Sequence, residues 1–134
     1  MKKKLISLIT AAVMALGISV PAMAADAKPM EGKLVVVHTN DMHGYYETTE
    51  TSIGIAGVAG LKNYYEAQGA DVLLLDAGDF SQGSTLVSYY KGKNAAEYMA
   101  AAGYDAVSMG NHEFDYSFDA LLDNMKVLTD AGVK

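Results

Sequence analysis

The sequence predicts an α/β fold in which strands and helices alternate as β-α-β-α-β-α and the strands form a parallel sheet. Three short apolar runs, at 33–38, 71–76 and 104–109, have the length and composition of strands. Stretches with helical spacing of apolar residues separate these runs, and the connections between them are short. This order implies parallel pairing with right-handed crossovers.

The first predicted strand is the valine-rich run 33–38, whose continuous apolar character is typical of a strand covered on both faces. The polar stretch 45–52, rich in threonine and glutamate, is predicted to be a loop. A helix is expected over 53–68, ending at Gly69. The apolar residues at helical spacing in this helix are Ile55, Val58, Leu61 and Tyr65.

The second predicted strand covers 71–76, and Ser84 or Thr85 is a suitable cap for the helical region after it. Gly92 is a point at which that region can divide into two helices. The third strand is expected at 104–109, and Ser117 can cap a last helix. The predicted inward face of this helix consists of Phe118, Leu121, Leu122, Met125 and Leu128. Val133 and Lys134 are then expected to open a fourth strand.

Residues 1–24 have the organisation of an export signal. Lys2 to Lys4 form a positive start, Leu5 to Val20 an apolar segment, and Ala22 to Ala24 a cleavage site with small residues. The apolar run is short for a membrane span of about 20 residues, so a membrane anchor is the less favoured alternative. We therefore expect a protein exported to the periplasm, cell surface or extracellular space, which contacts membrane only through this signal.

The charge of the remaining chain argues against nucleic acid as a partner. Beyond residue 24 the chain has seven lysines, no arginine and sixteen acidic residues. Nucleic-acid backbones are bound by clustered Lys and Arg, which this composition lacks. A phosphate ester could still bind if metal cations supply the positive charge. The sequence contains no cysteine, so no disulfide supports the fold and no lipoprotein anchor is possible.

Three polar motifs follow the three predicted strands. They are Asn-Asp-Met-His-Gly at 40–44, Gly-Asp-Phe-Ser-Gln-Gly at 78–83 and Gly-Asn-His-Glu-Phe-Asp at 110–115. In open parallel sheets, ligands bind beyond the carboxyl ends of the strands, and all three motifs fall there. Ordinary turn chemistry accounts for the glycines, but it accounts poorly for His43 and His112.

These motifs offer carboxylate, imidazole and amide donors and no thiol, a set that suits zinc, manganese or a similar divalent cation. Asp41 and His43 are two residues apart, so in an extended segment both would face the same cation. Asp79 could bridge two metal ions. Asn111 adds a neutral oxygen donor suited to a second cation.

His112 and Asp115 form a candidate catalytic pair. If Asn111 faces the metals, His112 is directed toward the substrate, and Asp115 is near enough to hold one ring nitrogen. The reaction implied is hydrolysis of a phosphate ester. Glu113 is expected to be structural, and His38 to be a satisfied histidine inside the fold.

The three motifs resemble the first three signatures of the calcineurin-like metallophosphoesterases. They are most similar to those of bacterial secreted 5'-nucleotidases, which include enzymes acting on UDP-sugars and 2',3'-cyclic nucleotides. The resemblance implies that 25–134 is the start of a metallophosphoesterase catalytic domain, truncated, that uses two divalent ions on a small-molecule phosphate ester, most simply a nucleotide. It gives these roles: Asp41 and His43 on one metal, Asp79 as bridge, Asn111 on the second metal, and His112 with Asp115 as catalytic pair.

The family also uses later histidines, one after a further strand and two in a Gly-His-x-His-like motif, and a carboxy-terminal domain that holds the base. None of these is present in this sequence. We therefore expect the chain to continue beyond Lys134 and to be inactive or feebly active alone. The alternative is an exported protein that binds a single metal ion, or a degenerate, non-catalytic interaction module.

Overall fold

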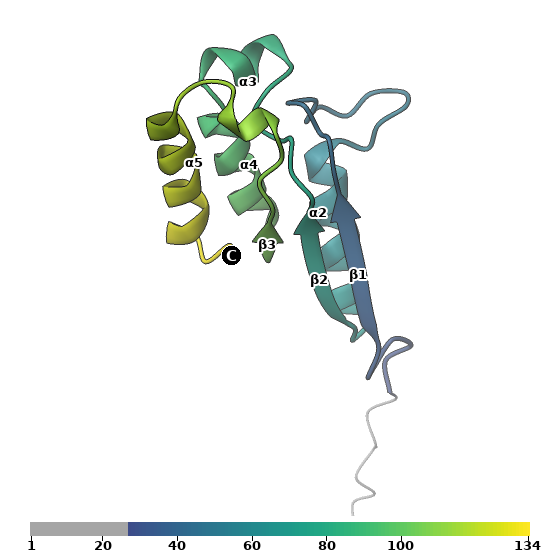
Figure 1. The fold of residues 1–134 in the computed structure, drawn as a ribbon. Coiled ribbons are helices and arrows are strands. Elements are labelled where there is room, and N and C mark those ends of the chain that lie inside the picture. Colours follow the sequence, from purple (N-terminus) through teal and green to yellow (C-terminus); the bar gives the residue numbers. More distant parts are fainter. Residues whose placement is uncertain (1–26) are drawn as a thin grey trace, which may run out of the picture.

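The computed structural model describes residues 27–134, so the predicted export signal at 1–24 lies outside the described residues. Strands β1 (Leu34–Thr39), β2 (Asp71–Asp76) and β3 (Ala106–Val107) form a parallel sheet in the order β1-β2-β3 (Figure 1). The predicted alternating α/β fold with a parallel sheet is confirmed.

Helices connect and cover these strands. Helix α2 (Gly54–Ala67) links β1 to β2 and lies behind both strands in Figure 1. Helices α3 (Thr85–Tyr89) and α4 (Lys93–Ala102) link β2 to β3. The 3-10 turn η1 (His112–Phe114) and helix α5 (Phe118–Asp130) follow β3, and α5 packs beside α4. Within 27–134, no helix combines the length and apolar character that crossing a membrane requires.

Local signals set the helix boundaries. The Ser84 hydroxyl accepts a hydrogen bond from Val87 N at 3.4 Å and caps α3, and the Ser117 hydroxyl accepts one from Ala120 N at 3.1 Å and caps α5. Gly92, with φ of 84°, separates α3 from α4. A side chain at Gly92 would also meet Ser81, so both backbone conformation and space require glycine there.

The core lies between the sheet and the helices. Leu74 of β2 and Met99 of α4 are fully buried, and Val37 of β1 packs against them. Lys62 of α2 adds a polar tie, because its ammonium donates to Asp105 Oδ2 at 3.1 Å. That same carboxylate oxygen accepts from Leu74 N at 2.8 Å, which joins α2, β2 and the entry to β3.

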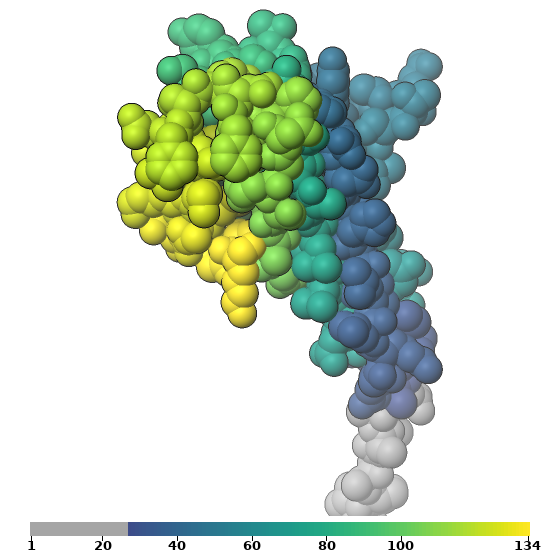
Figure 2. Space-filling model, in the orientation of Figure 1, coloured from purple at the N-terminus to yellow at the C-terminus, as the bar shows by residue number. Residues whose placement is uncertain are grey.

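The sheet face opposite α2 is exposed, whereas the first strand was predicted to be covered on both faces. Leu34 and Val36 of β1 are 64% and 54% exposed, and Leu73 of β2 is 40% exposed. His38 lies exposed on β1 as well, so the expectation of a satisfied interior histidine is wrong. Within 27–134 no element packs over this bare sheet face, and the side chains of β1 lie open on the surface in Figure 2. Because α2 covers only one face of the sheet, the apolar run at 33–38 does not correspond to a strand that is covered on both faces within 27–134.

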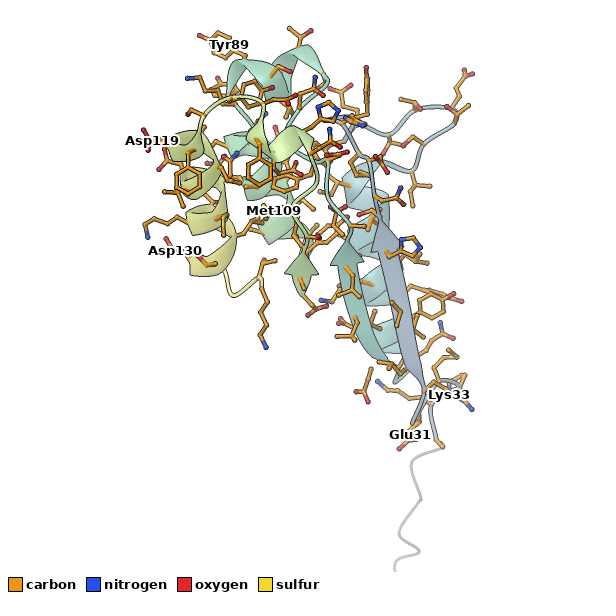
Figure 3. The ribbon with its side chains drawn as sticks, viewed as in Figure 1. Glu31, Lys33, Tyr89, Met109, Asp119 and Asp130 are labelled. Atoms are coloured by element: carbon orange, nitrogen blue, oxygen red, sulfur yellow. The ribbon has the colours of Figure 1, made fainter. Side chains whose placement is uncertain are left out.

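The third strand and the last helix also depart from expectation. Strand β3 contains two residues, although pairing extends further through Asp105 N to Leu74 O and Ser108 N to Asp76 O, both at 2.8 Å. On α5 the buried residues are Leu121, Asn124 and Leu128. Phe118, Leu122 and Met125 are exposed, contrary to prediction, while the labelled Asp119 and Asp130 point outward in Figure 3.

The Asn124 side chain explains why α5 buries a different face from the predicted one. Its amide nitrogen donates to Lys91 O at 2.8 Å, which turns the stripe containing Asn124 toward the α3–α4 corner. At the other end of the helix, Val133 is buried and Lys134 pairs with the strand. Val107 N donates to Lys134 O at 2.8 Å, and Lys134 N donates to Asp105 O at 3.1 Å. The described sheet has three strands, so the expected fourth strand is not formed within 27–134, although these two backbone hydrogen bonds continue the pairing at this edge.

The two faces of the sheet predict unequal costs for the same substitution. Leu74→Ala should lower the free energy of unfolding by about 2 to 5 kcal/mol, because it opens a cavity in the core. Leu34→Ala, on the bare face, should change it by about 0.5 kcal/mol or less. Urea denaturation followed by circular dichroism measures both. Equal losses would contradict the one-sided burial of β1 and β2.

Candidate metal centre

Three loops meet at the carboxyl edge of the sheet, each following one strand. The first loop lies along the second and is held by backbone hydrogen bonds. Asp41 N donates to Gly78 O at 3.0 Å, and His43 N donates to Asp79 O at 2.9 Å. Ser84 N then donates to His43 O at 2.9 Å. The strand-end motifs are therefore neighbours in space, although they are far apart in the chain.

Glu113 joins the third loop to the second. Its side chain is buried, and Oε1 accepts from Phe80 N at 2.8 Å and from Ser81 N and Oγ at 3.1 and 3.0 Å. Oε2 accepts from Asp79 N at 2.8 Å and from Gly110 N at 2.6 Å. The predicted structural role of Glu113 is confirmed by these contacts.

Two glycines allow the second and third loops to approach this closely. Gly78 has φ of 104°, and a side chain there would meet the backbone of Gly110. A Cβ at Gly110 would lie 2.6 Å from Asp79 N and would also meet the Asp79 carboxylate. Both positions therefore exclude any larger residue for steric reasons.

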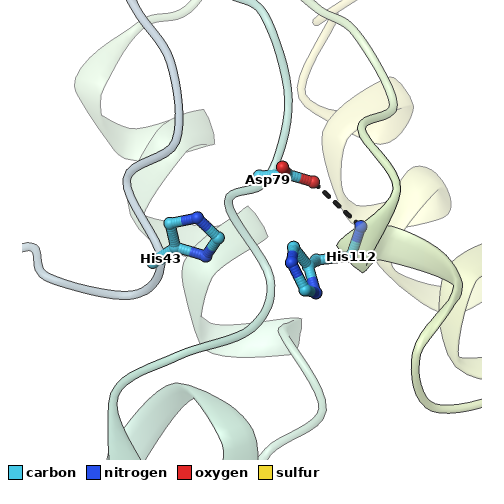
Figure 4. Close-up of side chains that lie close together, drawn as sticks. All are labelled: His43, Asp79 and His112. Atoms are coloured by element: carbon cyan, nitrogen blue, oxygen red, sulfur yellow. Dashed lines mark hydrogen bonds between the residues drawn. The ribbon is translucent and has the colours of Figure 1, made fainter.

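The loops bring His43, Asp79 and His112 together (Figure 4). One potential ligand atom from each residue lies within 4.8 Å of the others. The two imidazole rings are 5.2 Å apart between centroids and nearly perpendicular. Asp41 Oδ1 is 3.8 Å from His43 Nε2. This set of imidazole nitrogens and carboxylate oxygens fits a divalent cation of the zinc or manganese type.

The backbone reaches this arrangement by a route that differs from the prediction. The expectation that Asp41 and His43 converge because the chain is extended is wrong, since their φ angles are 52° and 45°. Asp79 is also left-handed, with φ of 59°. Such conformations are uncommon for residues other than glycine and persist where surrounding contacts fix them. Here the contacts are the hydrogen bonds between the loops.

His112 is part of the cluster, and contacts with two aspartates orient it. Its Nδ1 lies 2.7 Å from Asp115 Oδ2, and its backbone N donates to Asp79 Oδ1 at 2.8 Å. The hydrogen bond to Asp115 raises the pKa of His112, and the charges of Asp115, Asp79 and Glu113 act in the same direction. The imidazole adjoins His43 and Asp79 rather than facing away from them.

Asn111 stands immediately before η1, and its side chain is exposed. Its side-chain amide makes no hydrogen bond to residues 27–134. This predicted ligand directly precedes His112 of the cluster, and its side-chain oxygen has no hydrogen-bond partner within 27–134.

A buried polar network of Asp76, Thr39 and Tyr104 lies beneath the loops. Asp76 Oδ1 accepts from Gly78 N at 2.8 Å, and Oδ2 accepts from Thr39 Oγ1 at 2.5 Å. Thr39 Oγ1 is also 2.8 Å from the Tyr104 hydroxyl. Burial raises the pKa of Asp76 despite these hydrogen bonds. The signal that could have found this network is that Thr39 and Asp76 occupy paired positions at adjacent strand ends.

A cavity of about 600 Å³ adjoins the first loop and the start of α3. Its walls include Tyr46, Ile55, Leu86 and Tyr98, and it is largely apolar. His43, Asp79 and His112 do not line it. The chemistry of the metal cluster therefore belongs to the open edge of the sheet and not to this cavity.

Known proteins with similar sequences and structures share this part of the fold. A 5'-nucleotidase from Diplobatis ommata is 44% identical over 100 residues, which cover 68% of this chain and 17% of that protein. A 5'-nucleotidase from Bos taurus is 42% identical over 108 residues, covering 72% and 18%. The structure of NAD nucleotidase from Haemophilus influenzae aligns with a TM-score of 0.59 and 30% identity, over 69% of this chain and 19% of that one.

The chain thus spans less than a fifth of the length of these relatives. The family model for calcineurin-like phosphoesterases matches residues 34–132, a segment that begins with β1 and includes all three strand-end loops. This match shows that the chain belongs to the calcineurin-like phosphoesterase family.

Proposed function

We propose that this chain forms part of the catalytic domain of an exported, divalent-metal-dependent phosphohydrolase that acts on nucleotides. The observation that carries the proposal is the convergence of three tied loops on His43, Asp79 and His112 at the carboxyl edge of a parallel sheet. The family match and the 5'-nucleotidase relatives support the same chemistry.

We assign the metal ligands from the carboxylate, imidazole and amide donor atoms that the three loops offer. Asp41 and His43 would hold one cation, Asp79 would bridge, and Asn111 would contribute its free oxygen to a second. Bound divalent ions in such a site supply positive charge to the phosphoryl group and lower the pKa of a water nucleophile. The remaining protein ligands would come from outside this sequence.

His112 is proposed to carry the proton for the leaving oxygen. Its raised pKa favours the protonated, donating form, and Asp115 fixes the ring through Nδ1. Because Nδ1 is engaged, Nε2 is the atom available to a substrate. Removing the hydrogen bond to Asp115 would affect both ring orientation and proton affinity.

Nucleotides are the proposed substrate class because the relatives are named 5'-nucleotidases and NAD nucleotidase. UDP-sugars and 2',3'-cyclic nucleotides are the other members of this class to be tested. The chain is acidic and contains no arginine, and within 27–134 no lysine forms an ion pair with a carboxylate of the cluster. The charge for phosphate binding would therefore come from the metal ions and from outside this sequence.

Metal dependence tests the proposed function directly. The full polypeptide that carries this sequence should hydrolyse AMP, UDP-glucose or 2',3'-cyclic AMP. Chelation by EDTA should abolish this activity, and manganese or zinc should restore it. Phosphate or nucleoside release measures the rate. Metal binding with no hydrolysis of any phosphate ester would favour the non-catalytic alternative.

Asparagine substitutions separate a metal ligand from a catalytic acid. His43→Asn should raise the metal Kd by about 10-fold or more. His112→Asn should leave the metal Kd within about 3-fold but lower kcat by about 10² to 10⁴, the range for a lost general acid. Calorimetric metal titration and initial rates measure these effects. His38→Asn, an exposed histidine on the bare sheet face, is the matched control and should change neither. Loss of metal affinity in His112→Asn equal to that in His43→Asn would assign His112 as a ligand.

The Asp115 contact predicts the pH behaviour of His112. Asp115→Asn should lower the pKa of His112, because the imidazolium loses its charged acceptor. The contribution of this pair to stability is present below the ordinary histidine pKa and is lost as pH rises through the raised one. NMR titration of the His112 ring in metal-free protein measures the shift. Asp119→Asn, an exposed acid on α5, is the control. An unchanged or higher pKa in Asp115→Asn would contradict the assignment.

A further inference from the structure

We propose that Glu113 is a positioning residue that sets the geometry of Asp79 for metal binding, beyond its part in holding the fold. This inference rests on the proposed function, because it concerns the same metal centre. It assigns the fourth residue of the third motif to a role that acts through Asp79 rather than on metal or substrate.

The contacts of Glu113 are concentrated on Asp79 and the two residues that follow it. Its carboxylate accepts five hydrogen bonds, from the backbone of Asp79, Phe80, Ser81 and Gly110 and from the Ser81 hydroxyl. The side chain is 2% exposed, and within 27–134 it has no Lys or His partner. Four backbone N–H groups and one hydroxyl therefore satisfy the buried carboxylate without a cationic partner.

These contacts fix a strained residue. Asp79 is left-handed at φ of 59°, and its N–H is held by Glu113 Oε2 while its carbonyl accepts from His43 N. Its Oδ1 accepts from His112 N. The backbone of Asp79 is thus clamped on both sides, and Oδ2 alone has no hydrogen-bond partner within 27–134. Glu113 holds the Asp79 backbone from the third loop, and this contact defines the position of Asp79 Oδ2.

Glutamine is the informative substitution because it preserves the shape of the side chain while it removes the charge and replaces one acceptor oxygen by an NH₂ donor. Either amide orientation of Glu113→Gln turns an NH₂ group toward N–H or O–H donors that the carboxylate now accepts from. One orientation faces Asp79 N and Gly110 N, and the other faces Phe80 N and Ser81. The loop must then shift, while the packing volume stays the same.

The test compares metal binding by folded Glu113→Gln and unmodified protein, using the full polypeptide that carries this sequence. Manganese calorimetry should give a Kd raised at least about 10-fold, in the range seen when residues supporting a ligand are changed. The cobalt-loaded protein should also show an altered d–d absorption band. The altered band reports ligand geometry, so it separates repositioning of Asp79 from the simple loss of a nearby negative charge.

Two controls isolate the effect. Glu97→Gln makes the same chemical change on the exposed face of α4 and should alter neither Kd nor band. Leu128→Ala removes a buried side chain near the carboxy-terminal end of α5, and its folded fraction should bind metal normally. If Glu113→Gln does not fold, Ser81→Ala removes one of the five hydrogen bonds and should raise Kd by a few fold.

The outcomes are distinct. Unchanged Kd and band in folded Glu113→Gln, or in Ser81→Ala when the former does not fold, would overturn the positioning role and leave Glu113 purely structural. Absence of metal binding in the unmodified protein would overturn the proposed function itself. Binding by the unmodified protein with the expected changes in Glu113→Gln supports both.

Discussion

The buried carboxylate of Glu113 is the constraint on which the candidate centre depends. The carboxyl ends of the parallel strands lie at one edge of the sheet. The strands do not determine how the loops beyond that edge contact one another. Hydrogen bonds to one side chain determine it here, because four donated by the second loop hold that loop against the third and a fifth, from Gly110 N, fixes Glu113 within its own loop. The first loop is then held on the second by backbone hydrogen bonds. Glu113 thus fixes the second loop against the third, and backbone hydrogen bonds extend this order to the first loop.

Strain and close packing accompany this organisation. Asp41, His43 and Asp79 all have positive φ, a conformation that costs free energy for residues with a Cβ. Gly78 and Gly110 leave the second and third loops no space for a side chain between them. The loops have little freedom to relax, so their polar side chains are held in position before any ligand arrives. Such preorganisation is what a metal or transition state requires of its protein ligands.

Local patterns in the sequence predicted much of the fold, and the reasons for the failures are physical. The bounds of β2 and the caps at Ser84 and Ser117 depend on residues near in the chain, so they were predictable. The strand-end rule predicted where the motifs would gather. The left-handed backbone at Asp41 has no sequence signature, because long-range hydrogen bonds impose it. The rotation of α5 depends on one bond from Asn124 to a distant carbonyl, which periodicity cannot reveal.

The bare face of the sheet belongs to the same two strands whose ends lead into the candidate centre. Apolar side chains such as Leu34 and Val36 remain in water there, and covering them would release about 25 cal/mol for each Å² buried. Any polypeptide layer that packs on this face stabilises β1 and β2, whose ends lead directly into the loops with Asp41 and Asp79. By thermodynamic linkage, such a layer would increase the population of the ordered edge and would itself bind more tightly once that edge is ordered by a ligand. Binding at the sheet face and binding at the carboxyl edge would then be thermodynamically coupled through β1 and β2.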